Sequence, residues 1–191
     1  MYEKFGQFID GKWQASSNKE TYEVINPANE EVIGRASKAT PEDVDRALKS
    51  AEKGLEVWKK TSPWKRSSVI RKIADLIRAK QDVLAKWITL EVGKPFPEGK
   101  GEVGATADIF EWNSEETKRI YGQTVESRFE DTRIHVYYQP IGVVAAMSPW
   151  NFPLVLSGRK ISTALAAGCS VIIKPDVIAP GGVMELVDIC R

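Results

Sequence analysis

An asparagine in a short loop is the residue with the clearest chemical use in this sequence. Asn151 belongs to the loop at residues 148–152, which directly follows the apolar run at residues 141–147. Such a run is typical of a strand covered on both faces, and open α/β sheets bind ligands at the carboxyl ends of their strands. A side-chain amide held there can donate a hydrogen bond to an oxygen that gains negative charge in a reaction. The alternative, a rigid strand-to-helix turn plugged by aromatic side chains, is the commoner use of such a loop.

A lysine ends the next apolar run. Lys174 follows residues 171–173 and precedes Pro175. At a strand end its ammonium group can donate hydrogen bonds to hydroxyls or to a phosphate; the alternative is a solvated strand end. Neither apolar run is followed by a G-x-G-x-x-G turn, so we do not expect a glycine-rich turn there to hold phosphates.

The segments around these two residues follow the order strand, helix, strand. A helix is expected at residues 153–167, with Gly168 well placed to end it. This order predicts two parallel strands joined by a right-handed crossover, so Asn151 and Lys174 should lie at neighbouring strand ends. A last helix is expected at residues 183–191. A single unit of this kind cannot complete a doubly wound sheet, so we expect a fragment, a truncated product or a domain that needs a partner.

Short strands and several helices precede this unit. Asp10-Gly11 is a strong hairpin signal, and Thr40-Pro41 and Ser62-Pro63 indicate helix starts. Apolar spacing predicts a helix after each start, another that ends near Gly93, and one at residues 98–121. The early strands are expected at residues 8–9, 13–14, 22–25 and 32–36, and a half-exposed antiparallel pair at 124–129 and 133–139.

Two of these helices carry informative faces. In the first helix, one face is formed by Val44, Leu48, Ala51, Leu55 and Trp58. The helix that ends near Gly93 carries Leu84, Trp87, Ile88 and Glu91.

The composition excludes several classes of protein. The 191 residues are 42% hydrophobic and 28% charged, with a net charge of +1, which gives no field that favours nucleic acid. No apolar run is long enough to cross a membrane, and residues 1–4 do not begin a signal peptide. Cys169, Cys190 and the single histidine, His135, fit no metal spacing and no disulfide framework, so we expect no metal site and a cytoplasmic location.

Several segments together resemble the aldehyde dehydrogenase superfamily. They are Pro149-Trp150-Asn151-Phe152-Pro153 and the sequence ALAAGCSVIIKP at residues 164–175, which match in residue types and spacing. Residues 8–13, 24–28 and 90–95 are also similar to family segments, so the resemblance covers nearly the whole chain. It implies an α/β fold: the N-terminal part of the aldehyde dehydrogenase fold, with an incomplete parallel Rossmann-like sheet, flanking helices and a β-hairpin arm.

The resemblance also implies an organisation in three parts. Residues 1–122 are the N-terminal strands and helices of the cofactor-binding domain, residues 123–140 the oligomerisation arm, and residues 141–191 the first βαβ unit of the dinucleotide-binding domain, truncated. The arm at residues 124–139 implies a homo-oligomer for the full-length protein, and edge strands with polar faces suit that role. The alternative is a sheet within one chain only.

Family members oxidise an aldehyde to the acid with NAD or NADP. A cysteine thiolate attacks the carbonyl, hydride passes to the nicotinamide, and a glutamate-activated water hydrolyses the thioester. The resemblance implies that Asn151 donates its side-chain N–H to the developing oxyanion and that Lys174 binds the adenosine ribose. The cofactor pocket is then expected to be lined by Met147, Ser148, Trp150, Asn151, Lys174, Pro175, Asp176 and Val177.

The sequence departs from the family pattern in its cysteines. It contains neither the Gly-Gln-x-Cys type segment of the nucleophile nor the segment of the general-base glutamate. Cys169 lies on the wrong side of the motif, and Cys190 is interpreted as a small buried apolar residue. We therefore expect an aldehyde dehydrogenase by family whose present chain, alone, has no turnover.

Two further residues bear on specificity. Val177 stands where many NAD-using relatives have a glutamate for the ribose hydroxyls, while Asp176 restores part of the charge, which leans towards NADP or dual use; the alternative is that Val177 only packs against the loop. Residues 111–122 and Arg159-Lys160 resemble the semialdehyde branch, in which the residue matching Arg159 helps to hold the distal carboxylate of succinate semialdehyde. The alternative is an ordinary surface arginine.

Two other functions stay open beside the enzyme. One is a catalytically inactive module that binds a dinucleotide, and the other is a regulatory subunit that adds its arm to a full-length relative. Neither involves a nucleic acid or a membrane as partner.

Overall fold

The computed structural model describes residues 2–191, which begin with a 3-10 turn, Tyr2–Lys4, followed by two antiparallel hairpins. β1 (Gln7–Ile9) and β2 (Lys12–Gln14) are joined by Asp10 and Gly11, whose φ angles of 52° and 75° are those of a tight two-residue turn. β3 (Thr21–Ile25) pairs with β4 (Val32–Ser37). All four strands were predicted from the sequence and are confirmed to within one residue at each end.

The start of α1 (Pro41–Trp58) is fixed by a reciprocal cap. The hydroxyl of Thr40 accepts a hydrogen bond from the backbone N–H of Asp43, and the Asp43 carboxylate accepts one from the N–H of Thr40 at 3.0 Å. Ser62 caps α2 (Pro63–Ala79) in one direction only, since its hydroxyl accepts from the N–H of Lys65. Both predicted helix starts are confirmed, because such caps depend on residues only three positions apart.

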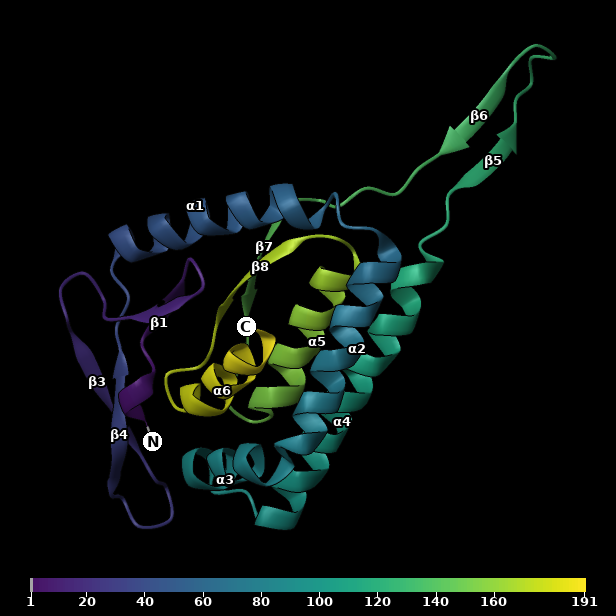
Figure 1. Ribbon diagram of the computed structural model, residues 1–191. Helices are drawn as coiled ribbons and strands as arrows, with labels where there is room; N and C mark the ends of the chain where they lie inside the picture. The colour runs from purple at the N-terminus through teal and green to yellow at the C-terminus, as the bar shows by residue number, and fades with distance from the viewer. Residues whose placement is uncertain (1) are drawn as a thin grey trace.

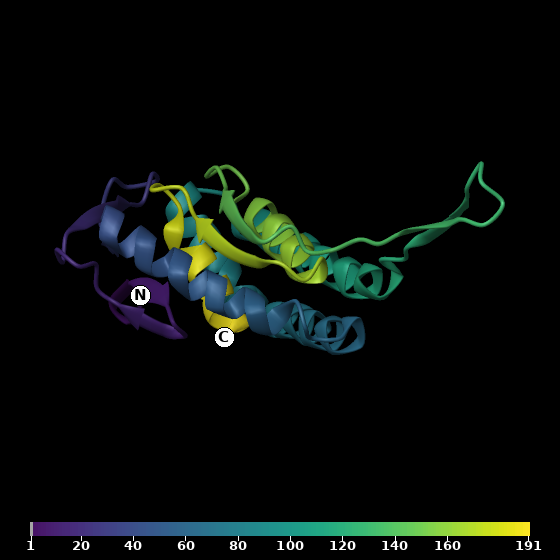
Figure 2. The same cartoon turned by 90° about the horizontal axis from the view of Figure 1, so that it is seen from above.

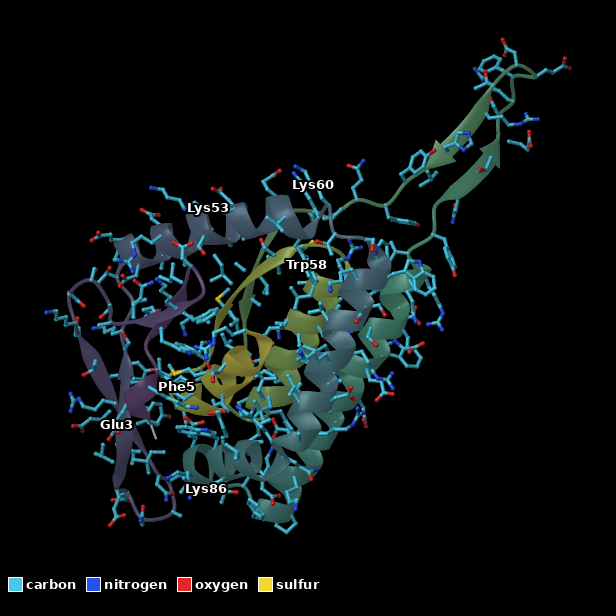
Figure 3. All side chains as sticks on the ribbon, in the orientation of Figure 1. Glu3, Phe5, Lys53, Trp58, Lys60 and Lys86 are labelled. Carbon is cyan, nitrogen blue, oxygen red and sulfur yellow. The ribbon has the colours of Figure 1, made fainter. Side chains whose placement is uncertain are left out.

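The predicted apolar face of α1 is buried only in part. Trp58 lies at the end of α1 above the end of α5 (Pro153–Ala166) and donates its indole N–H to the carbonyl of Leu165 at 2.8 Å (Figure 3). Val44 and Leu48, in the first turns, are 53% and 43% exposed. α1 contacts β1, β7 and β8, but these contacts leave the two side chains largely open to solvent in this chain.

The main core lies between helices. α4 (Phe96–Glu116) packs against both α2 and α5, which also contact each other, and α3 (Gln81–Val92) closes one end of this layer (Figure 1). Gly158 of α5 makes the close approach possible, since a Cβ there would stand 2.7 Å from the Cγ2 of Thr106. The largest buried side chains of this core are Ile70, Ile77, Leu84, Ile88, Val103, Phe110, Leu154 and Leu186.

The α4 helix is shifted from its predicted range. It begins at Phe96 and ends at Glu116, where a single 3-10 turn, Thr117–Arg119, replaces the helix that was expected to run to residue 121. The hydroxyl of Thr117 donates to the carbonyl of Asn113 at 2.6 Å, which accompanies the tightening of the chain at this end. The pattern Gly99-x-Gly101-x-x-Gly104 lies within α4 and not after a strand, so it is not a phosphate-binding turn.

A hairpin extends far from the body of the molecule. β5 (Gln123–Glu126) and β6 (Arg133–Val136) form it, and both views show it projecting into open space (Figures 1 and 2). Every residue of both strands is exposed, and the strands are shorter than predicted. An isolated two-stranded ribbon has no third strand to extend its pairing, which accounts for the shortness.

The last part of the chain is the predicted βαβ unit. β7 (Val143–Met147) and β8 (Ser170–Lys174) are parallel, α5 joins them, and α6 (Pro180–Cys190) follows. The expectation that residues 141–147 are covered on both faces is wrong for this chain. α1 and α5 both contact the strand pair, yet only Ala146 of β7 is buried, and the residues of β8 are partly buried or exposed. Within residues 2–191, no helix combines the length and the apolar character needed to span a membrane.

Candidate active site

The two polar residues singled out in the sequence lie at the same edge of the β7–β8 pair. The register places Met147 beside Lys174, and the N–H of Ser148 donates to the carbonyl of Lys174 at 3.3 Å. The loop that carries Asn151 therefore starts next to the end of the strand that carries Lys174. Both Asn151 and Lys174 are exposed. The predicted neighbourhood of the two strand ends is thus present in the structure.

The loop begins with a serine that faces inward. Ser148 is 6% exposed, and its hydroxyl lies 2.7 Å from that of Ser157 in α5. Its side chain therefore binds the loop to the helix, and since its N–H is hydrogen-bonded to Lys174, only its backbone carbonyl remains for a ligand. Trp150, by contrast, is 47% exposed and Met147 67% exposed. These two side chains present apolar surface at the strand edge.

Two residues that the sequence analysis gave no role hold the other end of the loop. Lys94 and Glu102 form an ion pair of 2.5 Å behind it. Glu102 accepts a hydrogen bond from the N–H of Leu154 at 3.0 Å, and Lys94 donates one to the carbonyl oxygen of Asn151 at 3.2 Å. Lys94 belongs to the segment at residues 90–95 that carried the family resemblance, which was the one available signal.

The N-terminus of α6 is occupied in a similar way. Neither α5 nor α6 is capped by the residue just before it. Glu91 of α3 accepts hydrogen bonds from the N–H groups of Gly181 and Gly182 at 2.6 and 3.0 Å, and from the hydroxyl of Tyr2. Burial raises the pKa of Glu91 to about 7, against the effect of these three donors. Since protein carboxylates fill both helix N-termini, neither is free to hold a phosphate in the usual way.

The segment after β8 turns back on itself. The ammonium of Lys174 donates to the carbonyl of Pro175 at 3.2 Å, and the carboxylate of Asp176 accepts from the N–H of Ile178 at 3.0 Å. Val177 is 55% exposed. An exposed cation beside exposed apolar side chains can bind a molecule that combines hydroxyl groups with flat ring surfaces.

Arg159 lies away from this edge, at a shallow hollow of about 400 Å³. The hollow is lined by α4 and α5, with Ile109 and Trp112 as its apolar side chains. Asp108 also lines it but is paired with Arg78 at 2.8 Å. Among residues 2–191, Arg159 itself forms no ion pair, so its guanidinium can meet an external carboxylate.

The cysteines do not complete the site. Cys169 is buried and follows the C-terminal end of α5, whereas Asn151 precedes the N-terminal end. A helix of 14 residues is about 21 Å long, which separates the two. Burial raises the pKa of the Cys190 thiol to about 12, which is unsuited to a nucleophile that must ionise. The part of the chain that is described contains no group of three residues able to hold a metal ion.

Comparisons with known proteins agree with this geometry. The sequence model of the aldehyde dehydrogenase family matches residues 13–191. The chain is 42% identical over 184 residues to a glutarate-semialdehyde dehydrogenase of Pseudomonas putida and 43% identical over 181 residues to a succinate semialdehyde dehydrogenase of Acinetobacter baylyi. These alignments cover 96% and 95% of this chain and 38% of each relative, so the chain spans well under half of their length.

A solved structure shows the same fold. It is described as an NADP dependent enzyme of Escherichia coli, and it matches with a TM-score of 0.96 at 38% identity. The match covers 100% of this chain and 40% of the other. The predicted fold, the N-terminal part of the aldehyde dehydrogenase fold with an incomplete parallel sheet, is confirmed.

Proposed function

Because the chain belongs to the aldehyde dehydrogenase family, we propose that it forms the cofactor platform and supplies one oxyanion donor of an enzyme that oxidises an aldehyde to the carboxylic acid. The observation that carries this proposal is the pairing of Met147 with Lys174, which brings the Asn151 loop and a strand-end lysine to one sheet edge. In this proposal the side-chain N–H of Asn151 stabilises the oxygen that gains charge when the aldehyde is attacked.

NAD or NADP is the proposed cofactor, and when bound it accepts the hydride of the aldehyde. The residues at the edge fit a nucleotide, since the exposed ammonium of Lys174 can donate to ribose hydroxyls while Met147, Trp150 and Val177 offer apolar surface. The absence of a glutamate at position 177 favours use of NADP as well as NAD, because no carboxylate at that position repels a 2′-phosphate.

The proposed substrate is a semialdehyde with a carboxylate at its far end. Arg159 supports this, because its guanidinium stands at a hollow between α4 and α5 and can bind a carboxylate with two hydrogen bonds. The relatives named for glutarate and succinate semialdehydes support the same class of substrate. Ile109 and Trp112 offer apolar surface in the same hollow, which suits the aliphatic stem of such a molecule.

The proposed partner is a second copy of the protein, bound through the arm at residues 124–139. The arm's strands expose their edges and side chains to solvent throughout, which is costly for an unpaired ribbon and suits pairing with another chain. We retain residues 1–122, 123–140 and 141–191 as the proposed three parts. The first and third share one core across α4 and α5 and so belong to one folded body.

The test is the substitution Asn151→Ala in the dehydrogenase polypeptide that contains this chain. Loss of one oxyanion donor is expected to lower kcat by about 10²–10³-fold, with little change in the affinity for NAD or NADP. Unchanged kcat would refute the assigned role. The chain of 191 residues alone is expected to show no turnover. If that chain bound a dinucleotide tightly and the longer polypeptide had no activity, a dinucleotide-binding module would be favoured instead.

A further inference from the structure

A buried ion pair stands directly behind the loop that carries Asn151. The side chain of Glu102, from α4, is 1% exposed, and that of Lys94, which precedes α4, is 11% exposed. Charges this deeply buried lose most of their hydration. Such pairs rarely stabilise a fold better than apolar side chains of the same size would. The pair therefore calls for an explanation other than stability.

Each partner of the pair also holds the backbone of the loop. One carboxylate oxygen of Glu102 accepts from the N–H of Leu154 at 3.0 Å and, at 3.4 Å, from that of Val155. The ammonium of Lys94 donates to the carbonyl of Asn151 at 3.2 Å and lies 3.7 Å from the centre of the Phe152 ring. The backbone is thus held on both sides of the start of α5: Lys94 holds the Asn151 peptide before it, and Glu102 holds the first turn of the helix.

The need to cap the N-terminus of α5 does not explain the presence of Lys94. At α6 the same task, a carboxylate on two N-terminal N–H groups, is carried out by Glu91 with Tyr2 and no lysine at all. At α5 the lysine is added, and its extra contact is to the carbonyl of Asn151. Compared with Tyr2 at α6, Lys94 adds two things at α5: a positive charge that pairs with Glu102, and a hydrogen bond to the Asn151 peptide.

We propose that Lys94 and Glu102 are positioning residues that fix the direction of the Asn151 side-chain amide through its own backbone. The proposal rests on the oxyanion role proposed above for Asn151. Lys94 fixes the peptide that bears the amide, and Glu102 fixes both Lys94 and the first turn of α5. Neither residue touches the aldehyde.

The informative variant replaces both charges together. Lys94→Met with Glu102→Gln keeps an oxygen that can accept from Leu154, retains the bulk of both side chains, and leaves no unpaired buried charge. It removes the donor to Asn151. The matched control is Lys100→Met with Asp82→Asn, which removes an exposed lysine–carboxylate pair of 2.8 Å that also joins α4.

The first measurement uses nuclear magnetic resonance on the 191-residue chain. In the double variant, the order parameter of the Asn151 side-chain amide is expected to fall while the N–H of Leu154 keeps its protection from hydrogen exchange. The control is expected to change neither. An Asn151 amide as ordered in the double variant as in the original chain would overturn the proposal.

The second measurement is kinetic, in the active dehydrogenase that contains this chain. Misplacement of the donor is expected to lower kcat by up to about 10²-fold, with KM for NAD or NADP unchanged. In an Asn151→Ala background the same pair of substitutions is expected to cost nothing more. A further loss of equal size there would overturn the positioning role. If Asn151→Ala itself left kcat unchanged, the oxyanion role would fail. The order of the Asn151 amide would still show whether Lys94 and Glu102 fix its position.

Discussion

Replacing Glu91 with glutamine should abolish a defined part of the pH dependence of folding. Glu91 is fully buried and meets three donors, the hydroxyl of Tyr2 and the N–H groups of Gly181 and Gly182. Burial, followed by the nearby charge of Glu91, holds the pKa of Tyr2 well above its ordinary value, so that Tyr2 remains a donor throughout. The group that titrates in this cluster near neutral pH is therefore the carboxyl of Glu91.

The magnitude follows from the pKa of Glu91, which burial raises from 4.5 to about 7. Between these two values the folded chain keeps a proton that the unfolded chain has lost, so the free energy of unfolding decreases as the pH rises. Each difference of one in pKa corresponds to about 1.4 kcal/mol, which gives a total loss of about 3 kcal/mol. Most of it falls between about pH 5 and about pH 8.

Urea unfolding of the chain and of Glu91→Gln at these two pH values is the assay. The glutamine amide has one acceptor oxygen fewer than the carboxylate and places its NH₂ group against one of the three donors. The variant is therefore less stable by a fixed amount. That penalty is the same at both pH values and cancels in the comparison. The stability of the variant relative to the original chain should therefore rise by about 2–3 kcal/mol from the lower pH to the higher. Parallel curves for the two proteins would refute the reasoning, and Glu98→Gln, an exposed acid, serves as the control.

Two further outcomes are expected. Arg159→Ala should lower kcat/KM for a carboxylate-bearing semialdehyde by about tenfold to a hundredfold, since hydrogen bonds between charged groups contribute about 1.5–3 kcal/mol, and an equal loss with an uncharged aldehyde would contradict the role. Gly158→Ala should destabilise the chain by about 1–3 kcal/mol in urea unfolding, because its Cβ would stand 2.7 Å from the Cγ2 of Thr106 and 3.2 Å from the Cε2 of Phe110. Gly104→Ala has no atom within 4 Å and should stabilise α4 by about 1 kcal/mol, so equal stability of the two variants would count against this packing.

The sequence was sufficient to predict a structural feature where that feature depends on residues close together in the chain. The caps at Thr40 and Ser62 act on residues three positions ahead, and both helices begin where these residues predict. The apolar runs that end at Met147 and Lys174 predicted two parallel strands, and the register bears this out. The placement of the Asn151 loop beside Lys174 follows from that pairing alone.

The remaining features depend on contacts between distant residues. Glu91 was placed on an apolar helical face, but its partners, Tyr2 and Gly181, lie about 90 positions away in the chain on either side. The positions of Lys94 and Glu102 in the sequence did not predict their contacts with residues 151–155, which lie more than 50 positions further along the chain. The exposure of Val44 likewise depends on what lies over α1, which the spacing of residues along a helix does not reveal.

The two buried glutamates bear on how the proposed cofactor site holds its ligand. In many nucleotide-binding folds, the free N–H groups at a helix N-terminus bind phosphate without any side chain. Here Glu102 and Glu91 occupy those groups on α5 and α6, which leaves the side chains of Asn151 and Lys174 as the donors that we propose for the ligand at the strand edge. A side chain has rotational freedom that a backbone amide lacks, and its direction must be fixed from behind. A buried charge pair on the Asn151 peptide is a costly but rigid way to do so, which is why its removal should affect the rate more than the fold.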